Sequence, residues 1–107
     1  MAKKILFVCT VNRLRSKTAE DLLKKDPRFE VKSAGVDKEA TTPLTKELLE
    51  WADCIFVMEK RHRNIIHKKY PDVYKSKKII CLYIDDIYDY MDPVLVDLLK
   101  EKFSTLL

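Results

Sequence analysis

The segment from Cys9 to Ser16 holds the side chains best suited to chemistry in this chain of 107 residues. An apolar run ends on Cys9, five residues follow, and Arg15 and Ser16 then open a helical pattern. A loop of this shape can point successive backbone N–H groups at a bound phosphate, and the helix N-terminus adds partial positive charge. The same field favours a thiolate at Cys9, so the spacing predicts a cysteine nucleophile beside a phosphate-binding loop.

The other residues of this segment complete the expected phosphate site. The planar guanidinium of Arg15 can hold two phosphate oxygens at once, a geometry that lysine cannot match. The Ser16 hydroxyl can donate to the sulfur of Cys9 and help to keep it ionised. Backbone amides of the loop bind the remaining oxygens, which gives the expected substrate-binding residues Thr10, Val11, Asn12, Arg13, Leu14 and Ser16.

The position of Cys9 distinguishes it from the other two cysteines. Only Cys9 has an arginine six residues later, because Cys54 precedes a lysine and Cys81 an isoleucine at that distance. Only Cys9 lies at an expected junction of strand and helix. The alternative is that Cys9 is a small buried apolar residue and Arg15 a surface charge in the first helical turn.

The composition excludes several other kinds of site. The single glycine, Gly35, excludes the GxGxxG dinucleotide loop and the Walker A loop, which need several glycines. Three cysteines without a CxxC pair argue against a disulfide framework and a structural zinc site, so we expect reduced thiols and a cytoplasmic protein. No metal or cofactor is expected, because the loop and Arg15 supply the positive charge. No apolar run reaches the roughly 20 residues that a bilayer requires, so no membrane partner is expected.

The chain carries a formal net charge of +4, which favours anionic partners. Its basic residues cluster at 60–63, 67–69 and 75–78. A solvated helix face and loop account for these clusters, and steering of phosphorylated substrates is the alternative. Nucleic acid is not an expected partner, because no aromatic side chains that could stack on bases lie among these charges.

Strand and helix patterns alternate along the chain. The predicted strands are 4–8, 29–33, 54–58 and 78–82, and the predicted helices are 16–25, 42–51, 59–70 and the segment from 93 nearly to the C-terminus. This alternation predicts a single α/β domain over residues 1–107, with a flavodoxin-like, three-layer arrangement of a four-stranded parallel sheet, strand order 2-1-3-4, and helices on both faces. Ligands bind at the carboxyl edge of such sheets, where residues 9–16, 58–59 and 84–90 should converge.

The loop resembles that of the low-molecular-weight protein tyrosine phosphatase family, whose form is C-L-G-N-x-C-R-S-P-x-A-E. This chain reads C-T-V-N-R-L-R-S-K-T-A-E. The matched residues are Cys9, Asn12, Arg15, Ser16, Ala19 and Glu20, and residues 33–35 and 52–58 also resemble family segments. The resemblance implies that Cys9 is the nucleophile, Arg15 the phosphate clamp, Ser16 the donor to the thiolate and Asn12 the residue that shapes the loop.

The sequence departs from the family pattern in three places. Val11 stands at the loop glycine, so Asn12 is expected to adopt the left-handed conformation instead. Leu14 stands at the second loop cysteine, which removes a partner for a protective disulfide with Cys9. Much of the region between Gly35 and Ala52 is absent, and with it part of the wall that shapes substrate choice.

The proton for the leaving group must come from a carboxyl group. Asp92 is better explained as the N-cap of the last helix, because Pro93 follows it at the first helical position. The resemblance aligns residues 84–88 with the family's acid segment, which makes Asp86 the general acid and base and places Tyr88 at the aromatic rim. Asp85 remains the alternative acid.

These observations predict a cysteine-dependent phosphomonoester hydrolase with a phosphocysteine intermediate on Cys9. The resemblance implies phosphotyrosine in proteins as the substrate, with small phosphomonoesters left open and inorganic phosphate as the product. Two alternatives are an arsenate reductase on the same loop and a non-catalytic module that binds phosphate or phosphopeptides. Arsenate reduction calls for further reactive cysteines near the loop, and Cys81 in a strand is poorly placed for that role.

Overall fold

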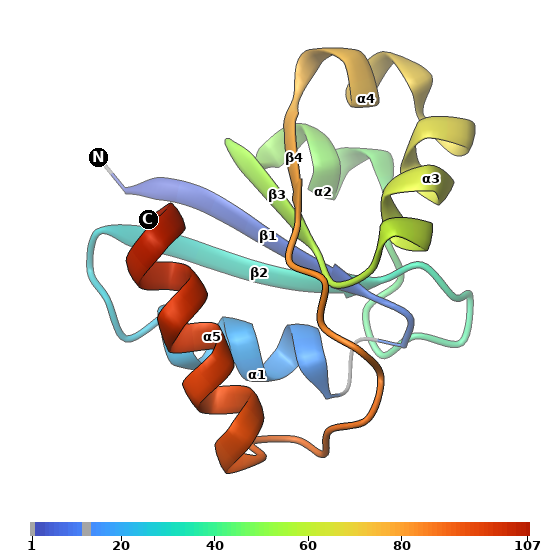
Figure 1. Cartoon of the computed structure of the whole chain (residues 1–107). Coiled ribbons are helices and arrows are strands. Elements are labelled where there is room, and N and C mark those ends of the chain that lie inside the picture. The colour runs from blue at the N-terminus through green and yellow to red at the C-terminus, as the bar shows by residue number, and fades with distance from the viewer. Residues whose placement is uncertain (1, 12–13) are drawn as a thin grey trace.

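The computed structural model describes residues 2–11 and 14–107 and contains a four-stranded parallel sheet. The strands are β1 (Lys3–Cys9), β2 (Phe29–Gly35), β3 (Cys54–Val57) and β4 (Lys78–Cys81), in the order β2-β1-β3-β4. Figure 1 shows helices on both sides of this sheet. The predicted α/β architecture and strand order are therefore confirmed.

The alternating side chains of the sheet divide the core into two clusters. One contains Ile5 and Phe7 of β1 and is covered by α1 (Arg15–Leu23) and α5 (Pro93–Leu106). The other contains Leu6 and Val8 and is covered by the remaining helices, α2 (Lys46–Trp51), α3 (Lys60–Lys69) and α4 (Pro71–Ser76). Because helices cover both faces, the central strands are apolar at consecutive positions, and Ile5 to Val8 have no exposed surface.

Two helices differ from the sequence prediction. Helix α2 begins at Lys46 rather than at Pro43, and the Thr45 hydroxyl caps it by accepting from the Leu48 amide at 3.2 Å. Residues before the helix are held by β2 instead, since Gly35 donates to the Thr42 carbonyl at 2.9 Å and pairs with Pro43. Pro71 ends α3 as expected, but it also occupies the first position of α4, which the pattern did not predict.

The start of α5 agrees with the sequence prediction. The Asp92 side chain accepts from the Val94 amide at 2.8 Å, and Pro93 occupies the first turn. This helix buries Leu95 and Leu99 against the sheet. None of the helices in the described part of the chain is both long and apolar enough to cross a membrane.

We expect Asp92→Ala to lower the free energy of unfolding by about 1 kcal/mol, because the substitution removes the side-chain acceptor at the N-cap of α5. Urea unfolding followed by circular dichroism measures the change. Asp97→Ala, an exposed position within the same helix, is the control and should change stability less. Equal effects of the two substitutions would show that capping by Asp92 is not the cause.

Candidate active site

The carboxyl ends of β1, β3 and β4 are joined by backbone hydrogen bonds. The Met58 amide donates to the Val8 carbonyl at 3.0 Å, and the Ile84 amide donates to the Met58 carbonyl at 2.8 Å. On the other side of β1, the Val36 amide donates to the Cys9 carbonyl at 2.9 Å. The three segments predicted to meet at this edge of the sheet therefore do meet there.

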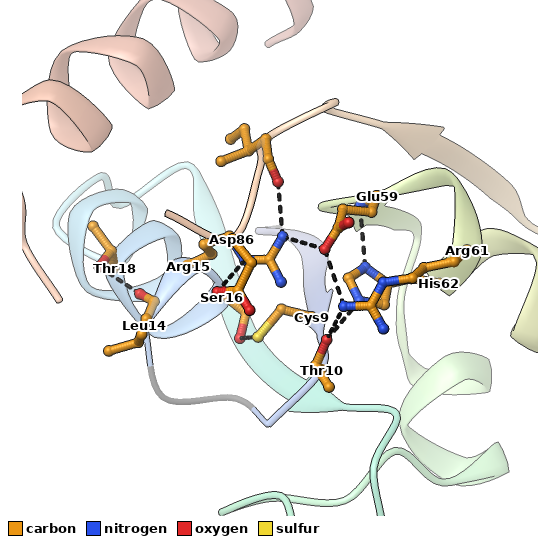
Figure 2. A network of polar contacts seen from close by, with 11 residues as sticks. Cys9, Thr10, Leu14, Arg15, Ser16, Thr18, Glu59, Arg61, His62 and Asp86 are labelled. Carbon is orange, nitrogen blue, oxygen red and sulfur yellow. Dashed lines mark hydrogen bonds and ion pairs between the residues drawn. The ribbon is translucent and has the colours of Figure 1, made fainter. Parts of the chain in front are cut away.

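Cys9 is the last residue of β1, and its side chain lies beside the first turn of α1. Its Sγ is 2.8 Å from the Ser16 hydroxyl oxygen, and both residues are buried. When the sulfur is a thiolate, only the hydroxyl has a proton to donate, so this contact stabilises the ionised form. The predicted pairing of Cys9 and Ser16 is present in the structure (Figure 2).

The backbone of the loop is oriented by the segment that follows β2. The carbonyls of Cys9, Thr10 and Val11 accept from the amides of residues 36, 37 and 41 at 2.9, 2.9 and 3.1 Å. In a trans peptide the N–H that follows a carbonyl points the opposite way. The N–H groups of Thr10 and Val11 therefore point away from this segment, as a loop that binds an anion requires. Asn12 and Arg13, and with them the predicted conformation of Asn12, lie outside the described residues.

Arg15 is almost fully buried, with a side-chain exposure of 2%. Its Nη1 donates to Glu59 Oε2 at 2.6 Å and to the Ile84 carbonyl at 2.7 Å. Its Nε lies 3.7 Å from Oδ1 of Asp86. Contacts from the ends of β3 and β4 therefore fix a guanidinium that comes from α1, as Figure 2 shows.

Glu59 binds two arginines with one carboxylate oxygen. Its Oε2 accepts from Arg15 at 2.6 Å and from Arg61 at 3.2 Å. Burial alone would raise the pKa of Glu59, but the hydrogen bonds from Arg61 and Arg15 outweigh it and lower the pKa below its usual value. Glu59 is therefore an anion at neutral pH.

His62 is a fully buried, neutral ring that links α3 to the loop. Its Nδ1 accepts from the Glu59 backbone amide at 3.1 Å, so the proton is on Nε2, which donates to the Thr10 hydroxyl at 3.1 Å. Burial, together with the positive charges of Arg61 and Arg15, lowers the pKa of His62 to about 4. The ring therefore contributes a hydrogen bond to the site without contributing charge.

The sequence reasoning did not assign these contacts of Glu59, Arg61 and His62. A signal was available, because all three follow the carboxyl end of β3, the edge where the site was expected. The capping box that Glu59 and His62 form at the start of α3 brings their side chains together.

The segment after β4 places Asp86 at the site and the other acidic residues elsewhere. Asp86 reaches Arg15, whereas Asp85 is exposed and Asp92 caps α5. Tyr88 is partly buried and packs against the core cluster beneath α1 and α5. Thr18 of α1 anchors the far end of the segment, because its hydroxyl accepts from the Met91 amide at 3.0 Å.

The remaining cysteines lie far from the loop. Cys81 packs on the face of the sheet opposite to Cys9, and Cys54 pairs with Ile5 at the other end of β1. None of the three cysteines, all of which lie within the described residues, forms a disulfide, and neither Cys54 nor Cys81 lies where a disulfide with Cys9 could form without backbone movement. This arrangement disfavours arsenate reduction by a relay of thiols. Within residues 2–11 and 14–107, no group of three or more His, Cys, Asp or Glu side chains could hold a metal ion.

We expect the buried neutral ring of His62 to make stability depend on pH. Above pH 6.5 the ring is neutral in both the folded and the unfolded chain, and its contribution is complete. As the pH falls from 6.5 to 4, only the unfolded chain binds the proton, so stability decreases by about 3 kcal/mol. Urea unfolding of wild type and His62→Gln at several pH values measures this contribution. It is the difference between the two proteins in how steeply the free energy of unfolding changes with pH.

His67→Gln is the matched control for that experiment, because His67 is exposed on the same helix and stacks on Tyr74. The His67 variant should keep the pH dependence of the wild type. Parallel curves for wild type and His62→Gln would contradict the prediction.

Comparison with known proteins finds similar chains among phosphatases. No family model matches the chain. A protein-arginine-phosphatase of Geobacillus stearothermophilus is 34% identical over 96 residues, covering 67% of this chain. The chain spans 65% of the length of that curated relative.

Two solved structures cover nearly the whole chain. Wzb of Vibrio vulnificus in complex with benzylphosphonate has a TM-score of 0.79 and 26% identity, over 98% of this chain and 97% of Wzb. The arginine phosphatase YwlE, as a cysteine-to-serine mutant with a phosphorylated active site serine, has a TM-score of 0.74 and 26% identity. The match covers 96% of this chain and 95% of YwlE. These relatives are phosphatases, and the fold and loop motif of this chain are similar to those of the low-molecular-weight protein tyrosine phosphatase family.

Proposed function

We propose that this chain is a cysteine-dependent protein phosphatase that works through a phosphocysteine on Cys9. The observation that carries the proposal is the pairing of Cys9 Sγ with the Ser16 hydroxyl at 2.8 Å, directly beside the fixed guanidinium of Arg15. A nucleophile, a donor that stabilises its ionised form and a buried cation then lie around one loop. The phosphorylated active site serine in the YwlE mutant supports the same kind of intermediate.

In the first step the Cys9 thiolate attacks phosphorus, the S–P bond forms and the bond from phosphorus to the leaving oxygen breaks. The Nη1 group of Arg15 is held by Glu59 and Ile84, so its Nε and Nη2 hold two phosphoryl oxygens. The loop amides from Thr10 onward bind the phosphoryl oxygens as negative charge develops on them.

Asp86 supplies the proton for the leaving oxygen and later takes a proton from the attacking water. Its side chain is 58% exposed and lies 3.7 Å from Arg15 Nε, so it can reach both the solvent and the bound group. Water then displaces the sulfur from phosphorus, which releases inorganic phosphate and restores the Cys9 thiolate.

The substrate is a phosphorylated protein side chain. The family resemblance favours phosphotyrosine, and the 34% identity with a protein-arginine-phosphatase makes phosphoarginine the second candidate. The short segment between β2 and α2 also leaves room for small phosphomonoesters. We expect the reaction to need no cofactor, and the three cysteines without a CxxC pair support a cytoplasmic location.

We expect Cys9→Ser to abolish turnover of an aryl phosphate, with a loss of about 10³-fold or more, because an alcohol is a far weaker nucleophile than a thiolate. Phosphate release measures the rate, and intact mass spectrometry detects the phosphoryl group retained on the protein. Cys81→Ser, on the opposite face of the sheet, should keep the wild-type rate. Undiminished turnover in Cys9→Ser would sink the mechanism.

We expect Asp86→Asn to lower kcat by about 10²-fold to 10³-fold, because an amide cannot protonate the leaving group. The loss should be smallest for aryl phosphates with acidic leaving groups, which need little protonation. Asp85→Asn is the control and should keep most of the activity. The opposite pattern, with Asp85→Asn impaired and Asp86→Asn active, would transfer the acid role to Asp85.

A further inference from the structure

Arg61 is a second guanidinium beside the loop that the proposed reaction does not use. Its Nη2 donates to the Thr10 hydroxyl at 2.6 Å and to Glu59 Oε2 at 3.2 Å. Figure 2 shows the side chain reaching from the start of α3 back toward Thr10. Thr10 directly follows Cys9, so these contacts hold a fixed positive charge next to the phosphate loop.

The charge of Arg61 is only partly compensated by its surroundings. The ionised carboxylate of Glu59 is shared with Arg15, which also lies 3.7 Å from Oδ1 of Asp86. The neighbouring ring of His62 is neutral. Among the described residues, the one carboxylate that pairs with Arg61 also serves Arg15, so Arg61 can still attract an anion from the side that faces α3.

The Nη1 and Nε groups of the Arg61 guanidinium are available to a ligand. Both of its contacts use Nη2, and among the described residues no partner contacts Nη1 or Nε. The side chain is 51% exposed. An N–H of Nη1 can therefore donate a charge-assisted hydrogen bond to a carboxylate of the ligand.

The distance to the reacting group suits a neighbouring residue of a peptide. Arg15 and Arg61 bind the same oxygen of Glu59, so their guanidinium groups are only a few ångströms apart. Consecutive residues of an extended peptide are separated by about 3.3–3.6 Å. A residue adjacent to the phosphorylated one can therefore reach Arg61 while the phosphoryl group occupies the loop.

The rest of α3 has the same charge preference. Lys60, Lys68 and Lys69 of this helix are exposed. An acidic segment that leaves the loop along α3 would meet positive charge, and charge of one sign along a surface attracts such a partner over several ångströms.

We propose that Arg61 forms a second anion subsite that binds the carboxylate of an Asp or Glu residue next to the phosphorylated side chain of a protein substrate. The proposal rests on the proposed function in one respect, that the phosphoryl group occupies the loop. Arg61 is then a specificity-determining residue, which selects acidic sequences rather than taking part in the bond changes.

Binding of paired phosphonate peptides tests the proposal independently of turnover. Both peptides carry a non-hydrolysable phosphotyrosine analogue, flanked by glutamate in one and by glutamine in the other. We expect wild type to bind the glutamate peptide about fivefold more tightly, as a partly exposed ion pair allows. Arg61→Gln should reduce this ratio to about one, and 0.5 M salt should weaken it in the wild type.

Lys68→Gln is the matched control, because it removes the same charge from an exposed position two turns along α3. This variant should keep the wild-type ratio. An equal loss of affinity for both peptides in Arg61→Gln would overturn the proposal and assign Arg61 to positioning Glu59 and Thr10. An unchanged ratio in Arg61→Gln, or no binding of either peptide to the wild type, would also overturn it.

Turnover of an aryl phosphate by the wild type separates this proposal from the function itself. Turnover without a preference for the glutamate peptide refutes the subsite and leaves the phosphatase intact. A preference that depends on Arg61 in a protein without turnover supports the subsite and refutes the phosphatase function.

Discussion

The buried guanidinium of Arg15 is the constraint on which the rest of the site depends. A cation that is almost fully removed from water is costly unless acceptors surround it, and removing a partner from such a buried pair costs about 3–5 kcal/mol. The acceptors are Glu59 at the end of β3 and the Ile84 carbonyl just after β4. Arg15 comes from α1, whereas its two acceptors follow β3 and β4. The guanidinium therefore gains both acceptors only when the parallel sheet is assembled in its correct register.

The negative charge of Glu59 must itself be offset, because an anion beside the proposed phosphate site opposes phosphate binding. Arg61 offsets it by donating to the same carboxylate oxygen, and the helix that begins after Glu59 carries further basic residues. His62 stays neutral and uses its one proton on Thr10. Adjacent residues at the start of α3 therefore do both tasks: Glu59 holds Arg15 in place, and Arg61 offsets the negative charge of Glu59.

Local patterns were sufficient to predict much of the fold. The four strands, the start of α5 at Asp92 and the Cys9–Ser16 contact all follow from periodicity, capping residues and short-range spacing. The predicted start of α2 was wrong, because pairing of Pro43 with Gly35 at the end of β2 overrides the helix-start signal of Thr42 and Pro43. The topology indicated at which edge of the sheet the partners of Arg15 and Thr10 would lie. The individual contacts were not predicted, since they depend on side-chain directions at residues more than forty positions away.

The short segment after β2 shows how a loop with no glycine can still present its amides to an anion. In residues 9–11 the carbonyl groups are taken by residues 36, 37 and 41, so the peptide planes are set by partners outside the loop. Glycine gives a loop freedom to find such an orientation, whereas here hydrogen bonds impose it. The segment of residues 36–41 therefore has a structural role, and shortening it would release the peptide planes of residues 9–11.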